Sequence, residues 1–129
     1  LKVHAKAALV TRREADGTRH YAHVGTGNYN PRSGRQYTDL SLFSSRPALT
    51  ADIATLLSAL EQGSSLPNGL AHGSLVAPHH LLPALLARIE REAEHARAGR
   101  LSGITIKVNG LADTETVRAL CRASQAGVP

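Results

Sequence analysis

Apolar and polar residues alternate along the first part of the chain, and a period of two is typical of β-strands. The alternation predicts strands at Lys2–Val10, Tyr21–Gly25 and Tyr37–Phe43. The apolar side of the first strand would consist of Val3, Ala5, Ala7 and Leu9. The polar link between the first two strands contains Asp16 and Gly17, a common turn pair, so these strands are predicted to form a hairpin.

From residue 50 the apolar positions recur with the period of a helix, which predicts a helix over Thr50–Gly63. A longer amphipathic helix is predicted roughly over His79–Ala98. A further strand at Ile104–Val108 and a last helix capped by Asp113 follow, with Cys121 on the buried side of that helix. Strands and helices in this order predict the α/β fold class.

The stretch from Gly63 to Ser74 is rich in Gly, Ser, Pro and Asn and carries almost no charge, which predicts a boundary there. The chain is accordingly expected to consist of two parts. The chain starts inside a predicted strand without an initiator Met and stops where a helix should lead into another strand. We therefore expect a piece of a longer protein, with part of any active site outside it.

Amino-acid composition and charge favour some classes of protein and argue against others. The chain has 129 residues, of which 42% are hydrophobic, so a core can form. Aromatic residues make up only 3%, which argues against a base-stacking platform. A single cysteine and no long apolar run predict a soluble, cytoplasmic protein without disulfides or zinc. The net charge of +5, concentrated before residue 47, predicts either anionic ligands or a basic surface kept for solubility.

Candidate chemistry begins with His4 and Lys6, which would project from the same side of the first strand. By themselves they are more typical of a solvated strand face than of a site. The stretch GTGN, Gly25–Asn28, ends the next strand, and H-x-K with G-[ST]-x-N resembles a half-site of the phospholipase D superfamily. In that superfamily the histidine attacks phosphorus and the other groups hold the phosphate. The superfamily pattern requires an aspartate where this chain has Thr11, which makes such a hydrolase less favoured.

A longer resemblance covers essentially the whole chain. The segments LKVHAKAALVTRRE, YAHVGTGNYNPRSGRQYTDLSLF, GITIKVNGLAD and ASQAGVP resemble consecutive parts of the bacterial polyphosphate kinases. That family reversibly transfers the terminal phosphate of ATP to polyphosphate. The resemblance implies parts of two phospholipase D-like α/β domains, with residues 1–65 as the later part of the first and 66–129 as the opening part of the second. It also implies Mg²⁺, whose ligands we expect outside this chain, so no metal ligand is assigned within it.

Carried over position by position, the resemblance implies that His4 becomes phosphorylated and that the ring of Tyr37 packs against the adenine of ATP. Three further residues are assigned by physical argument. Lys6 would neutralise phosphate charge, or be a surface lysine; Asn28 would bind phosphate, or cap the loop. His23 would contact phosphate or orient a partner, or serve as a structural histidine. These alternatives stay open at the level of the sequence.

The loop residues Arg32 and Arg35 would contact a polyanion or be ordinarily solvated. Asp39 would fix a basic neighbour or take part in the site, or be an exposed residue at the start of the strand. Three further histidines are interpreted as surface or helix-start residues: His72, His79 and His80. Expected partners are ATP, ADP and polyphosphate, without nucleic acid. The resemblance implies a homo-oligomer in the full-length protein and allows peripheral membrane association. The alternatives are a phospholipase D-type phosphodiesterase or nuclease, and a non-catalytic polyanion-binding module; this chain alone is expected to be inactive.

Overall fold

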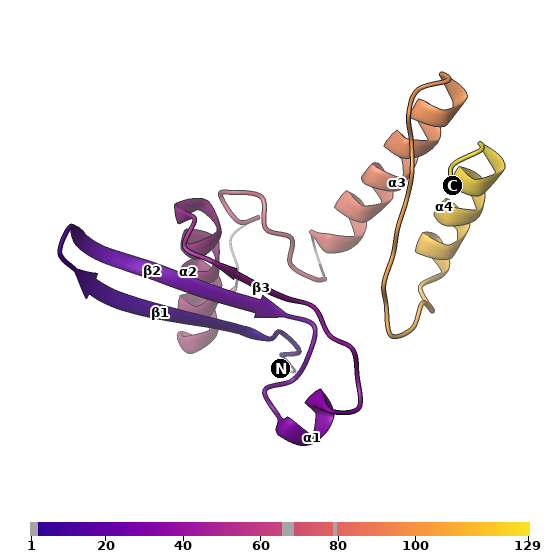
Figure 1. Ribbon diagram of the computed structural model, residues 1–129. Coiled ribbons are helices and arrows are strands. Elements are labelled where there is room, and N and C mark those ends of the chain that lie inside the picture. The colour runs from indigo at the N-terminus through magenta and orange to yellow at the C-terminus, as the bar shows by residue number, and fades with distance from the viewer. Residues whose placement is uncertain (1–2, 66–68, 79) are drawn as a thin grey trace. The chain divides into compact units, whose positions relative to one another are not determined.

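The computed structural model describes residues 3–65, 69–78 and 80–129 (Figure 1). The chain divides into two compact units, Leu1–Ser74 and Leu75–Pro129. The first contains a three-stranded antiparallel sheet with helices, and the second contains two helices among its described residues. The α/β fold class is therefore confirmed. The assignment of residues 1–65 and 66–129 to two separate domains stays a prediction.

The sheet of the first unit is built on a long hairpin. Strand β1 (Ala7–Glu14) pairs antiparallel with β2 (Gly17–Gly25), from Ala7 opposite Val24 to Glu14 opposite Gly17. The short strand β3 (Ser41–Ser44) pairs with the far edge of β2, which gives the order β1-β2-β3. The predicted hairpin is confirmed. Its strands run further into the polar link than predicted, because backbone pairing continues from Val10 opposite Tyr21 to Glu14 opposite Gly17. The turn therefore consists of Ala15 and Asp16, one residue before the predicted pair of Asp16 and Gly17.

Two predicted strand boundaries are wrong in a way that matters for the site. Residues 3–6 precede β1 and are not part of a strand, while Lys2 lies outside the described residues. The third strand was expected at Tyr37–Phe43, but only Ser41–Ser44 pairs, so Tyr37 and Asp39 lie in the preceding loop. Alternation of residue types indicates an extended chain, whereas a strand also requires a hydrogen-bonding partner.

Helix α2 (Pro47–Glu61) packs against β1 and β2 on one face of the sheet (Figure 1). The buried apolar residues of this unit include Ala22 of β2 together with Ile53, Leu56 and Ala59 of α2. The helix begins one turn before the predicted start at Thr50. Pro47 occupies its first turn, a position where the missing N–H and the fixed φ of proline suit a helix.

A buried carboxylate ties the segment after α2 back onto that helix. Asp52 is only 1% exposed, and its two oxygens accept hydrogen bonds from the backbone N–H groups of His72 (3.1 Å) and Ser74 (3.0 Å). Burial alone would raise the pKa of Asp52, but the hydrogen bonds from Ser74 and His72 outweigh burial and hold this pKa below its usual value. The ionised carboxylate therefore stabilises the end of the first unit.

Replacing this carboxylate tests its role and its pH dependence. In Asp52→Asn an amide NH₂ faces a backbone N–H donor. We expect the free energy of local opening of the 72–74 segment to fall by about 1–3 kcal/mol at neutral pH. Because the folded pKa is lowered, the contribution of Asp52 is complete above the ordinary carboxyl pKa and is lost as the pH falls through the folded value. Hydrogen exchange of the His72 and Ser74 amides in the full-length protein measures the loss of local stability and its dependence on pH.

The control for this prediction is Glu61→Gln, which neutralises an exposed carboxylate on the same helix. The difference between wild type and Asp52→Asn should be large at pH 7 and shrink in acid, while Glu61→Gln should match wild type throughout. Equal protection of both amides in Asp52→Asn and wild type at pH 7 would show that the carboxylate does not hold this segment.

The second unit is a helix pair. Helix α3 (Leu81–Arg97) packs against α4 (Thr114–Gln125), and their shared core consists of Ile89, Ala93, Ala119 and Ala123. Small side chains at the contact allow the helix axes to approach closely. Cys121, predicted to be buried, is exposed. It stands two residues after Ala119, which is a rotation of about 200° around the helix.

The segment between these helices departs from the sequence prediction. Ile104–Val108 was expected to be a strand, but it forms no ladder with any described residue. Its first residue donates one backbone hydrogen bond, from Ile104 N to the carbonyl of Pro129 (3.1 Å). The predicted cap of the last helix is confirmed, since the Asp113 carboxylate accepts from Thr116 N at 2.7 Å. Within the described residues, no helix has the length and apolar character needed to cross a membrane.

Candidate functional site

The structure brings together the two sequence segments that carry the predicted chemistry. The carbonyl of Lys6 accepts a hydrogen bond from Gly25 N at 2.9 Å, directly beyond the last β1–β2 pair. The H-x-K segment thus lies beside the start of the GTGN turn. His4, two residues before Lys6, is exposed. The expectation that His4 and Lys6 project from one face of a strand is wrong, because neither residue lies in the strand.

The ring of His23 is held by neighbours that the sequence did not single out. Its Nδ1 lies 2.6 Å from the hydroxyl oxygen of Tyr29, and its centroid lies 4.4 Å from that of Phe43. His23 is opposite Ala8 of β1 and opposite Phe43 of β3. It therefore lies on the central strand of the sheet, two residues before the GTGN turn. The aromatic residues Tyr29 and Phe43 follow the turn within twenty residues, but only the register shows that they meet His23.

The two glycines of the turn make room for side chains. A Cβ on Gly25 would lie 3.1 Å from Cε1 of His23, and a Cβ on Gly27 would lie 2.4 Å from a carboxylate oxygen of Asp39. Neither glycine has a left-handed φ. The missing side chains of these two glycines admit His23 and Asp39.

Thr26 connects the turn to the loop before β3. Its backbone N–H donates to the carbonyl of Leu40 at 3.0 Å, and its hydroxyl donates to Oδ1 of Asp39 at 3.0 Å. The same hydroxyl oxygen accepts the backbone N–H of Leu40 at 3.0 Å. Thr26 therefore closes the base of a loop that contains Asn28 and Tyr37. Asp39, left open at the level of the sequence, is engaged with the turn.

Asn28 and Asn30 divide two roles that the sequence left open. The side chain of Asn30 accepts from the backbone N–H groups of Arg32 (2.9 Å) and Ser33 (3.2 Å) and so caps the short helix α1 (Pro31–Gly34). The Asn-Pro pair at its start is a helix signal that sequence reasoning missed. Asn28 is exposed, and its amide makes no hydrogen bond with another described residue. The capping role expected for Asn28 belongs to Asn30.

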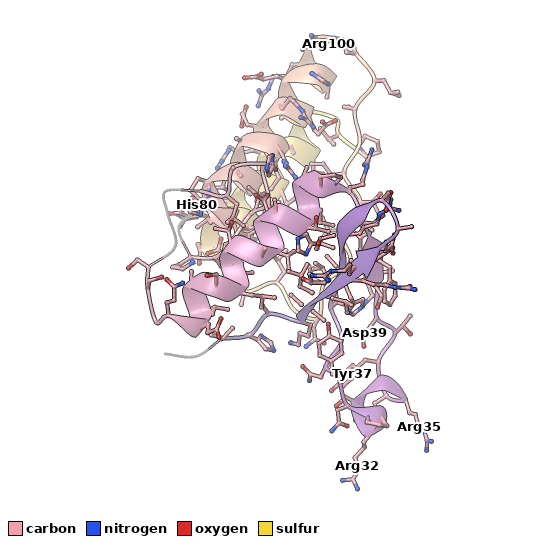
Figure 2. All side chains as sticks on the ribbon, turned by 90° about the vertical axis from the view of Figure 1, so that its left-hand side faces the viewer. Arg32, Arg35, Tyr37, Asp39, His80 and Arg100 are labelled. Atoms are coloured by element: carbon pink, nitrogen blue, oxygen red, sulfur yellow. The ribbon has the colours of Figure 1, made fainter. Side chains whose placement is uncertain are left out.

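The loop beyond α1 carries the remaining predicted residues outward. Tyr37 is 60% exposed, and its backbone N–H donates to the carbonyl of Ser33. Figure 2 shows Asp39, Tyr37, Arg35 and Arg32 in succession from the sheet toward the tip of this loop. Neither arginine forms an ion pair with a described residue. The tip is therefore basic and uncompensated, and Tyr37 lies between it and the turn.

Other candidate features belong to other segments of the chain. An open depression of ≈ 470 Å³ at the start of α2 is lined in part by Arg46 and His72, and none of the predicted site residues lines it. His72 is exposed and His80 is the N-cap residue of α3, while His79 lies outside the described residues. Among the described residues no three His, Cys, Asp or Glu side chains gather as potential metal ligands.

Comparison with known families gives two matches that together cover nearly the whole chain. Residues 1–66 match the family model described as polyphosphate kinase C-terminal domain 1. Residues 74–129 match the model described as polyphosphate kinase C-terminal domain 2. The two matches follow one another in the order of their names. All the predicted site residues, from His4 to Tyr37, fall within the first.

Comparison with individual proteins agrees with the matches to the family models. The chain is 46% identical over its full length to a polyphosphate kinase of Streptomyces coelicolor and 44% identical over 99% of its length to one of Synechocystis. It spans only 17% of each of these relatives. A crystal structure of polyphosphate kinase from Porphyromonas gingivalis matches with a TM-score of 0.81 and 33% identity, over 99% of this chain and 20% of that one.

Proposed function

Because the chain belongs to the polyphosphate kinase family, we propose that the full-length protein reversibly transfers the terminal phosphate of ATP to polyphosphate through a phosphohistidine at His4. The observation that supports this most directly is the hydrogen bond from Gly25 N to the Lys6 carbonyl. It sets the H-x-K segment beside the turn that carries Asn28. An accessible histidine, a lysine and a free amide are then available to one phosphoryl group.

The proposed reaction has two steps. A ring nitrogen of His4 attacks the γ-phosphorus of ATP, the bond from that phosphorus to the bridging oxygen breaks, and ADP leaves with the electron pair. A terminal oxygen of polyphosphate then attacks the phosphohistidine, and the N–P bond breaks to regenerate the imidazole. Lys6 and Asn28 would bind the non-bridging oxygens, and Tyr37 would pack against the adenine. His4 is exposed, as a group that must reach two substrates in turn has to be.

Magnesium is implied by the family, but the described residues do not form a resident site for it. We derive no step from the ion and expect its ligands in other parts of the full-length protein. We also expect this chain to be inactive in isolation, because it covers only about one sixth of the length of its relatives and the rest of the site lies outside it. ATP, ADP and polyphosphate are the proposed partners.

The test is a labelling experiment on the full-length protein with ATP labelled at the γ-phosphate. The proposal predicts label on the protein that is stable in base and labile in acid, as a phosphoramidate is, and that passes to added polyphosphate. A parallel incubation with a phosphodiester substrate tests the phospholipase D-type alternative. Thr11, which stands where that alternative requires an aspartate, bonds instead to His20 at 2.9 Å.

Three outcomes separate the hypotheses. Transferable label without diester hydrolysis supports the kinase. Diester hydrolysis without ATP-dependent label supports the phosphodiesterase. Binding of polyphosphate that weakens with salt, with neither reaction, supports a polyanion-binding module. The second and third outcomes each contradict the proposed function.

A further inference from the structure

We propose that Thr26 and Asp39 are positioning residues that hold the GTGN turn against the segment carrying Tyr37. This inference rests on the proposed function, since it assigns the two residues a task in that reaction. Neither residue is proposed to touch substrate. Their hydrogen bonds instead fix the distance between the place where the phosphate would bind and the place where the adenine would bind.

The first step of the argument concerns the end of the β2–β3 ladder. In an antiparallel pair, two opposed residues commonly exchange both of their backbone hydrogen bonds. Thr26 gives its N–H to the carbonyl of Leu40, but the N–H of Leu40 goes to the Thr26 hydroxyl. The side chain thus takes the place of the Thr26 carbonyl in the ladder. The two strands can separate at this point while the backbone N–H groups of Thr26 and Leu40 both stay bonded.

The second step concerns the proton of that hydroxyl. It is donated to Oδ1 of Asp39, so the hydroxyl accepts on one side and donates on the other. The second carboxylate oxygen of Asp39 occupies the space beside Gly27 where a Cβ would lie, at 2.4 Å from that position. Asp39 therefore holds the turn by a hydrogen bond at Thr26 and by direct packing at Gly27. We call this arrangement the Thr26–Asp39 clamp.

The third step concerns what the clamp holds. Asn28 lies two residues after Thr26, and Tyr37 lies two residues before Asp39. Between them the chain forms α1, capped by Asn30, and Tyr37 N bonds back to this helix. The loop is thus ordered within itself, and the clamp closes it. An ATP molecule bound through both residues would span the clamp, so its loss would misplace one end of the nucleotide relative to the other.

Two substitutions at Thr26 test this in the full-length protein. Thr26→Val keeps the shape of the side chain and removes its hydroxyl, whereas Thr26→Ser keeps the hydroxyl. We expect Thr26→Val to slow single-turnover phosphohistidine formation by about 10- to 100-fold and to raise KM for ATP, because small misplacements of reacting groups have effects of this size. Thr26→Ser should stay close to wild type. Thr18→Val, at the other end of the hairpin, is the control for an exposed threonine.

Hydrogen exchange of the Leu40 amide provides a readout that does not depend on activity. The clamp predicts that protection of this amide is lost in Thr26→Val and retained in Thr26→Ser. Unchanged Leu40 protection in Thr26→Val overturns the clamp. Lost protection with unchanged KM and labelling rate overturns the positioning role while leaving the proposed function intact. Absence of label in the wild-type protein overturns the proposed function and the positioning role with it, and the exchange data still decide whether the clamp exists.

Discussion

Replacing His4 with glutamine in the full-length protein should abolish ATP-dependent labelling and lower polyphosphate synthesis by at least about a thousandfold. Glutamine can still donate a hydrogen bond, but its amide cannot act as the nucleophile in a covalent phosphoryl transfer. The fold should not change, because His4 is exposed and precedes the first strand. The effect should appear in the single-turnover labelling rate, with the melting temperature of the protein unaltered.

The control is His72→Gln, which removes an exposed histidine from the same unit. The side chain of His72 is not part of the proposed site, and its backbone N–H, which Asp52 accepts, is kept in the variant. It should label at the wild-type rate. Base-stable label of normal stoichiometry on His4→Gln would exclude His4 as the nucleophile. Normal polyphosphate binding together with lost labelling would separate the chemical role of His4 from a role in binding.

The second large effect is expected for Gly27→Ala. The added Cβ would lie 2.4 Å from the Asp39 carboxylate, closer than any ordinary contact, so the Asp39 side chain must turn away from Thr26 or the backbone of the turn must shift. We expect a loss of about 1–3 kcal/mol in stability and of about 10- to 100-fold in labelling rate. Chemical denaturation and single-turnover labelling of the full-length protein measure these two effects separately.

Gly34→Ala is the matched control, because a Cβ on Gly34 would have no neighbour within 4 Å and its φ is not left-handed. It should be close to neutral. Combining Gly27→Ala with Asp39→Ala removes the atoms responsible for the clash, so Gly27→Ala should cost less stability in that background. An equal cost in both backgrounds would show that the requirement for glycine has another origin.

The hairpin and the three longer helices, α2, α3 and α4, could be predicted because their signals are local. Each signal involves residues close together in the sequence: a period of two or of 3.6, the Asp-Gly pair at residues 16 and 17, and the helix cap at Asp113. The predicted strand at Ile104–Val108 failed because alternation does not supply a hydrogen-bonding partner. Cys121 was misplaced because a residue near an apolar stripe is buried only if the partner helix meets that side, and α3 meets Ala119 and Ala123 instead.

The sequence by itself determined the α/β class, the positions of most helices, and, through the resemblance to polyphosphate kinases, the family of the chain. It also selected His4, Lys6, His23, Asn28 and Tyr37 as candidates, whose roles stay proposals. Only the tertiary structure decided which groups hold the turn. Thr26 meets Asp39 thirteen residues away, and His23 meets Phe43, through the pairing of β2 and β3, while Tyr29 reaches His23 from the loop after β2. Such contacts depend on which distant segments pair and in which register, and local periodicity does not show either.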